Sequence, residues 1–501
     1  APISAGAAKT YSSSGDITLN TVTAGALVIA NNGATAGSRI LDSGVLTVSG
    51  TSSFTTVANS GVITLDLAHA LTGAVTLNTK SSNTSAHATL DNGTTALNIA
   101  TSSVGGTLTL RSGNASGITD SGNVTVGVNF VATTDADDGV ITMDTLKVDG
   151  TIALNPHGTG AVTIVNDVGL KLAASTMGGT FSGTATAGDI SDSGNLVITG
   201  AATFITTAAG GDIILDTTTN VFTGAVTLNT TGSTGHAEVD GGTTILDIAA
   251  STVGGNLSLT SGHATGITDS GTVTVGGNLI ATNDVSNGDI NMGSLAVDGT
   301  IALTTSGSGG DVTLVNDVGL DFATSNIGGD LAATAITGDI SDSGTLTVTG
   351  ATEMTLGTTP TLTVTDVTSA SVDGDTLIIL DNSVFTGGIT LNYGGELVLI
   401  VDDDGSSTDI ALAVQVAFVG LTNRVDQMDL LSGIQDLASG STLIKELKDA
   451  AEKKDIDEDI PDDEEGDEEF EDEFEDEFED EEDEEDEDEE DEEDEDEEDE
   501  E

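Results

Sequence analysis

Two short loops place several carboxylates beside a glycine turn, an arrangement that suits calcium. One loop reads Asp-Ala-Asp-Asp-Gly and the other reads Asp-Asp-Asp-Gly. Calcium prefers oxygen ligands, and a turn lets neighbouring carboxylates face one point. The candidate calcium ligands are therefore Asp135, Asp137, Asp138, Asp402, Asp403 and Asp404. Neither loop completes the twelve-residue calcium loop that ends in Glu, and Asp-Gly turns between strands explain both loops equally well.

The residue types give little support for catalysis. The five histidines are His69, His87, His157, His236 and His263, and no acid or nucleophile is arranged around any of them. We interpret them as exposed loop residues. The chain has no Cys, which excludes disulfides and thiolate metal sites. It also has no Trp and only 2 Tyr, whereas polysaccharide sites normally offer aromatic platforms. We therefore expect a protein that is not an enzyme and requires no cofactor, with calcium as an optional ligand.

The charge of the chain limits its partners. The formal net charge is −73, and 40 of the 47 residues from 455 to 501 are acidic while none is basic. The first 454 residues keep 84 − 40 = 44 acids against 11 basic residues, a net charge of −33. Phosphate backbones would be repelled, so we expect no nucleic-acid binding. No apolar run approaches the roughly 20 residues that span a bilayer, so we expect no transmembrane segment.

Two landmarks recur along the chain with a period of about 75 residues. Asp-Ser-Gly begins at Asp42, Asp120, Asp192, Asp269 and Asp342. A Gly-Gly pair closes the phrases SSVGG, STMGG, STVGG and SNIGG, which begin at Ser102, Ser175, Ser251 and Ser325. Alternate copies are more alike, so a longer period lies near about 150 residues. We expect the five aspartates to cap turns, and stacked copies would form a carboxylate ladder that a cation could neutralise.

The runs between the landmarks are short and alternate apolar residues with Thr, Asn or Asp, which predicts strands with one buried face. A string of β-sandwiches and a parallel β-solenoid could both hold strands at this density. The absence of an aromatic core marker and the small length drifts between copies favour the solenoid, because corner loops absorb such drifts. We predict an all-β parallel β-solenoid (β-helix) of about 75-residue repeats, with coils of about 20 residues.

The chain divides into three regions on this interpretation. Residues 1–400 form the solenoid. Residues 401–454 change from strand to helical spacing and form a short C-terminal strand and helix cap, since an open coil edge needs cover. Residues 455–501 form a disordered polyacidic tail, which would attract multivalent cations or basic partners.

The phrases DSGNLVITGAATF, STVGGNLSLTSG and GDIILDT resemble the repeats of filamentous-haemagglutinin-like adhesins and other giant bacterial surface proteins with β-strand repeats. The resemblance covers roughly residues 10–400. It implies a right-handed parallel β-helix that projects from the cell surface and mediates adhesion.

Three functions follow as hypotheses. The first is a non-enzymatic, adhesin-like bacterial protein of the cell surface or extracellular space, a rigid rod that self-associates into a filament or layer or binds a ligand on a host or neighbouring cell. The start Ala-Pro-Ile fits either a mature exported product or an excised fragment. The second is a cation- or mineral-binding matrix protein that acts through the tail. The third is a β-helical polysaccharide-active enzyme with a cleft of carboxylates.

Overall fold

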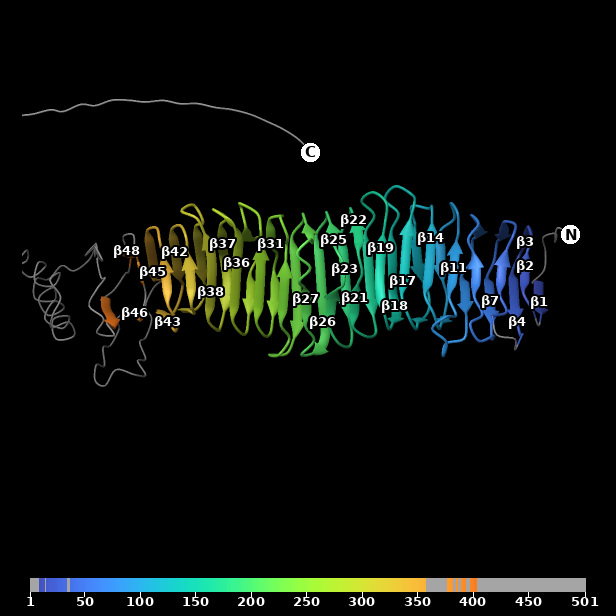
Figure 1. Ribbon diagram of the computed structural model, residues 1–501, viewed down its shortest axis with the longest axis horizontal. Coiled ribbons are helices and arrows are strands. Elements are labelled where there is room, and N and C mark those ends of the chain that lie inside the picture. The colour runs from blue at the N-terminus through green and yellow to red at the C-terminus, as the bar shows by residue number, and fades with distance from the viewer. Residues whose placement is uncertain are drawn as a thin grey trace, which may run out of the picture. The chain divides into compact units, whose positions relative to one another are not determined.

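The structure is a computed structural model that describes residues 9–13, 15–33 and 37–356 and four further strands between residues 376 and 402. Its side chains are described for residues 13, 15–33 and 37–355. The predicted tail, and the predicted cap beyond Asp402, lie outside the described residues. Figure 1 shows the strands of residues 9–356 side by side along one axis.

The strands stack in two principal faces, and every strand pairing among the described residues is parallel. Face one consists of β1 (Lys9–Ser13), β4 (Leu27–Asn31), β7 (Ser52–Thr56), β10 (Val75–Asn78), β12 (Leu97–Ile99), β13 (Ser102–Val104), β15 (Ile118–Asp120), β16 (Val124–Val126), β18 (Ile141–Val148), β20 (Val162–Asn166), β23 (Phe181–Ala185), β26 (Ala202–Ala209), β29 (Val226–Thr231), β31 (Leu246–Ile248), β32 (Ser251–Val253), β34 (Ile267–Asp269), β35 (Val273–Val275), β37 (Ile290–Val297), β39 (Val312–Asn316), β42 (Leu331–Ala335), β45 (Thr352–Leu356) and β48 (Ile389–Asn392).

Face two includes two small three-stranded sheets that continue it past a bend. It consists of β2 (Ile17–Leu19), β3 (Val22–Ala24), β5 (Ile40–Asp42), β6 (Leu46–Val48), β8 (Ile63–Leu65), β9 (Ala70–Leu71), β11 (Ala88–Asp91), β14 (Leu108–Ser112), β17 (Phe130–Thr134), β19 (Thr151–Asn155), β21 (Leu170–Leu172), β22 (Ser175–Met177), β24 (Ile190–Asp192), β25 (Leu196–Ile198), β27 (Ile213–Leu215), β28 (Val221–Phe222), β30 (Ala237–Asp240), β33 (Leu257–Ser261), β36 (Leu279–Ser286), β38 (Ile301–Ser306), β40 (Leu320–Phe322), β41 (Ser325–Ile327), β43 (Ile340–Asp342), β44 (Leu346–Val348), β46 (Thr376–Asp381), β47 (Val384–Phe385) and β49 (Leu397–Asp402).

The register of the paired strands confirms the predicted solenoid. Leu108 pairs with Phe130, and Phe130 pairs with Ile152, so these steps along the stack are equal and close to the predicted coil length. The steps near the start of the chain are unequal, since Lys9 pairs with Leu27 and Leu27 pairs with Ser52. Each coil therefore lies on the one before it, and corner loops absorb the variation in length.

One continuous apolar core runs between the two faces. Alternate residues of each strand point inward, as in the buried positions of Val162, Ile164 and Asn166 on β20. The core extends from Leu19 to Met354 and is built mainly of Val, Leu and Ile. Burial of one face of each strand accounts for the period-2 pattern, since successive side chains of a strand point to opposite sides.

The shorter and the longer sequence periods have a common structural cause. In most coils one face carries a straight strand, while the other face carries two short strands, or one irregular strand, around a bend. The bent side changes from one face to the other after β10, β19, β29 and β38, whose first residues are Val75, Thr151, Val226 and Ile301. The bend therefore changes face once in each shorter period of about 75 residues. After two such changes it is back on its original face, which gives the longer period of about 150 residues.

Each exchange leaves a gap in the ladder of backbone hydrogen bonds, which a serine hydroxyl fills. Strand β10 pairs with β12 at Val75 and with β13 at Asn78, and the N–H of Leu77 lies between these points. Ser102 Oγ accepts that N–H at 3.0 Å and donates to the Ala100 carbonyl at 2.8 Å. The same two bonds recur, with the same lengths, at Ser175, Ser251 and Ser325. Each of these four serines is the residue with which one of the Gly-Gly phrases begins.

The Gly-Gly pairs sit where successive coils touch at a corner. A Cβ added to Gly106 would lie 2.6 Å from Nδ1 of His87, and one added to Gly255 would lie 2.5 Å from Nδ1 of His236. The first glycine of each pair instead faces a backbone carbonyl of the preceding coil. Side chains therefore do not fit between the coils at these corners.

Candidate functional site

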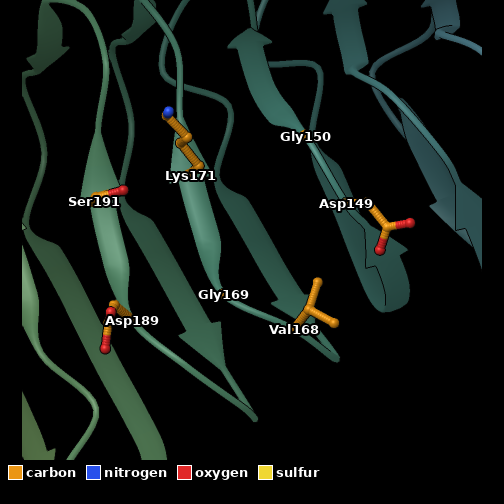
Figure 2. Close-up of a pocket in the computed structure, with 7 residues that line it drawn as sticks. All are labelled: Asp149, Gly150, Val168, Gly169, Lys171, Asp189 and Ser191. Atoms are coloured by element: carbon orange, nitrogen blue, oxygen red, sulfur yellow. The ribbon is translucent and has the colours of Figure 1, made fainter.

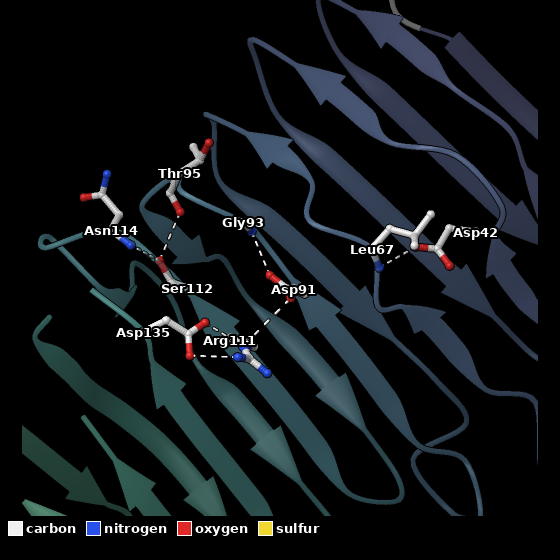
Figure 3. A network of polar contacts seen from close by, with 9 residues as sticks. All are labelled: Asp42, Leu67, Asp91, Gly93, Thr95, Arg111, Ser112, Asn114 and Asp135. Carbon is white, nitrogen blue, oxygen red and sulfur yellow. Dashed lines mark hydrogen bonds and ion pairs between the residues drawn. The ribbon is translucent and has the colours of Figure 1, made fainter. Parts of the chain in front are cut away.

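The first candidate calcium loop directs its three carboxylates to three different partners. Asp135 binds Arg111, with 2.6 Å from Nε to Oδ2 and 2.9 Å from Nη2 to Oδ1 (Figure 3). Asp137 Oδ1 lies 2.8 Å from His157 Nδ1. Asp138 accepts the N–H and the hydroxyl of Thr159, both at 2.7 Å, and these bonds lower the pKa of its carboxyl.

The described residues hold no group of three or more His, Cys, Asp or Glu side chains placed to hold a metal ion. The three carboxylates of the first loop are thus not brought together. Asp402 is the last residue of β49, and its side chain lies outside the described residues, as do Asp403 and Asp404. Calcium binding at either loop stays a prediction.

The Asp-Ser-Gly aspartates cap bends, as expected, but they do not stack on one another. The two carboxylate oxygens of Asp269 accept the N–H groups of Gly293 and Ser294, at 2.8 and 2.7 Å, in the next coil. In the preceding coil, Asp269 pairs with Ile248, and Asp42 pairs with Leu19. The copies therefore form no carboxylate ladder, because they lie about 75 residues apart along the chain and a coil holds only about 20 residues, so more than one coil separates them.

Other aspartates also bind the next coil. The Oδ1 atoms of Asp289, Asp311 and Asp330 accept the N–H groups of Asp311, Asp330 and Ala351, at 3.1, 2.8 and 2.7 Å. A carboxylate that accepts backbone N–H groups stabilises its coil boundary. Part of the acidity of the solenoid thus has a structural role.

The histidines differ in burial, and the interpretation of all five as exposed is wrong for His69 and for His263. His87, His157 and His236 are exposed, and the Nδ1 atoms of His87 and His236 accept the N–H groups of Thr107 and Asn256, both at 2.8 Å. His263 is half-buried. His69 is only 1 % exposed, because the neighbouring coils cover the bend between β8 and β9.

A shallow groove of about 300 Å³ lies on face two where β19 meets β21 (Figure 2). Its lining residues are Asp149, Gly150, Val168, Gly169, Lys171, Asp189 and Ser191. The strands pair there through only two residues of each strand, because the straight β19 meets a bent coil. The equivalent of Lys171 one longer period further along the chain is Asp321, which reverses the charge. No sequence motif marks this groove, since its residues come from separate coils.

Figure 3 shows the guanidinium of Arg111 between Asp91 and Asp135. Its Nε lies 4.0 Å from Asp91 Oδ2. In the copy one longer period further along the chain the aspartates recur as Asp240 and Asp284, but Thr260 replaces the arginine. Burial raises the pKa of Asp240, and the nearby carboxylate of Asp284 adds to this effect.

We expect Thr260→Arg to restore the missing bridge and to lower the pKa of the Asp240 carboxyl, because a guanidinium favours its charged form. The gain in stability should stay within about 1 kcal/mol, since the equivalent Arg111 is largely exposed. Titration of the Asp240 carboxyl by NMR measures the shift. Thr260→Gln is the control, and an equal shift in that variant would show that charge is not the cause.

Comparison with known families finds repeats of one type. A family model described as "Repeats of unknown function (DUF5649)" matches residues 5–78, 159–229 and 309–395. The starts of these three matches are spaced by the longer period of the sequence. No curated protein and no solved structure matches the chain. The chain is thus a β-solenoid protein, and parts of it are similar to the repeats of this family.

Proposed function

We propose that this protein is a non-enzymatic structural rod of the bacterial cell surface or extracellular space. The observation that carries the proposal is the single uninterrupted core from Leu19 to Met354, which gives a stiff stack of coils without a hinge between domains. The caps made by Asp269 and Asp311 support it too, because these carboxylates hold coils together. Among the described residues no three His, Cys, Asp or Glu side chains are placed together to hold a metal ion, and nothing else there favours the polysaccharide-active enzyme, which is therefore the weaker proposal.

An adhesin-like role is the finer form of this proposal. The resemblance of the repeats to surface adhesins supports it, and the partners would be other copies of the chain or a ligand on a neighbouring cell. No helix of the described residues is long and apolar enough to cross a membrane.

Electron cryo-microscopy of the purified chain tests the form of the rod. Single straight rods on the order of 100 Å long are expected for a stalk, from about 4.8 Å between stacked strands. Long fibres or sheets would instead make self-assembly the function. Flexible strings of separate particles would contradict the rigid rod.

A second candidate function is capture of cations or a mineral surface by residues 455–501, favoured by their 40 carboxylates. Such binding is diffuse and falls with ionic strength. Equilibrium dialysis with calcium should show most of the bound ion lost when residues 455–501 are deleted. Unchanged calcium binding after the deletion would reject this function.

A further inference from the structure

A buried histidine and aspartate face each other between the second and third coils. The side chains of His69 and Asp42 are 0 % and 3 % exposed, and His69 Nε2 lies 2.9 Å from Asp42 Oδ2. The N–H of Leu46 donates to His69 Nδ1 at 3.0 Å. Because Nδ1 accepts this bond, the proton of the neutral ring lies on Nε2, on the side of the carboxylate. Asp42 Oδ2 also accepts the N–H of Leu67 at 3.0 Å (Figure 3).

The same bend recurs one longer period further along the chain, with an asparagine in place of the histidine. Asn220 Oδ1 accepts the N–H of Leu196 at 2.9 Å, and Asn220 Nδ2 donates to Asp192 Oδ2 at 2.6 Å. Asn220 is also buried. The carboxamide therefore fills the same place as the imidazole, but it cannot take up a proton near neutral pH. The fold does not require a titratable group at this position.

Protonation of His69 would remove the acceptor of the Leu46 N–H. A proton on Nδ1 turns that atom into a donor that faces another donor, inside the core. Asp42, Asp66 and Asp91 are the carboxylates that act on the ring, from the preceding bend, its own bend and the end of β11, and they favour the charged form. Burial acts against it and is the largest effect, so the pKa of His69 is lowered.

The lowered pKa of His69 determines how the stability of the folded protein changes with pH. The folded protein binds the proton of His69 less readily than the unfolded chain, whose histidine has its ordinary pKa of about 6.5. The stability contributed by the neutral pair is thus complete above that pH. It is lost progressively as the pH falls below about 6.5 toward the lower folded-state value.

We propose that the bend at His69 is an acid-sensitive switch that opens its coils locally when the ring takes up a proton on Nδ1 and the Leu46 bond breaks. The equivalent bend at Asn220 stays closed under the same conditions. Local opening of this kind suits a solenoid, because each coil contacts only its neighbours and coils can open separately.

Hydrogen exchange of the full chain between pH 7.5 and pH 5.5, corrected for the intrinsic exchange rate, tests the switch. Below pH 6.5 the opening equilibrium in peptides that contain Leu46 should rise by up to about tenfold per pH unit. Peptides that contain Leu196 should not change. Equal changes at both bends, or no change at either, would overturn the proposal.

Two reciprocal variants separate the histidine from its surroundings. His69→Asn should remove the pH dependence at Leu46, because it installs the side chain that the fold already uses at Asn220. Asn220→His should create the same dependence at Leu196. If His69→Asn does not fold, Asn220→His still decides the question, and an unresponsive Leu196 in that variant would overturn the proposal.

Discussion

Gly117→Ala is expected to destabilise the solenoid by about 3 kcal/mol, from steric overlap and an unfavourable backbone conformation together. Gly117 has a φ of +61°, a region that residues with a Cβ adopt only at a cost. An added Cβ would overlap the carbonyl oxygen of Val140 in the next coil. That oxygen accepts the N–H of Ile118 at 3.0 Å, so relief of the overlap must weaken the ladder.

Urea unfolding followed by circular dichroism measures the effect, and Gly293→Ala is the matched control. Gly293 has no positive φ, and an added Cβ there meets no atom within 4 Å. Its replacement should change the stability by no more than about 0.5 kcal/mol. Equal losses of stability in the two variants would show that the close contact between coils is not what requires glycine at position 117.

Ser175→Ala should lower the free energy of unfolding by about 2 kcal/mol, because it leaves the buried N–H of Leu154 without an acceptor. The Ser175 hydroxyl accepts the N–H of Leu154 at 3.0 Å at the point where β19 loses its regular partner. Both residues are buried, so water cannot replace the hydroxyl without opening the core. Hydrogen exchange at Leu154 should rise together with the loss of stability.

Ser258→Ala provides the control for this substitution, since Ser258 is a half-buried residue on the outer side of β33. It should change the unfolding midpoint little. A similar midpoint for the two variants would mean that the Leu154 N–H has another acceptor, and the role assigned to the Gly-Gly phrases would be wrong.

The solenoid and its coil length could be predicted from sequence because they depend on local patterns. Alternation within short runs predicts strands with one buried face, and the repeated Asp-Ser-Gly and Gly-Gly landmarks give the period. The exchange of the bend between faces could not be predicted, because it depends on which strand lies below. The serine hydroxyls of Ser102 and Ser175 have a function only in relation to that strand.

The candidate site was less predictable for the same reason. Asp135 and Asp138 are close in sequence, yet their partners Arg111 and Thr159 come from the coils on either side. His69 stands between two alanines in a loop-like stretch, and the coils around it decide its burial. A local pattern predicts which face of a strand is buried, but it does not predict what a loop residue meets in the next coil.

The central functional claim is that the rod stands outside the cell. Immunogold labelling of intact, unpermeabilised cells with antibodies raised against the solenoid tests it most directly. We expect dense labelling at the cell surface or on extracellular material, which disappears in cells that lack the protein. Labelling that appears only after the cells are permeabilised would mean that the rod lies inside the cell, contrary to the proposed function.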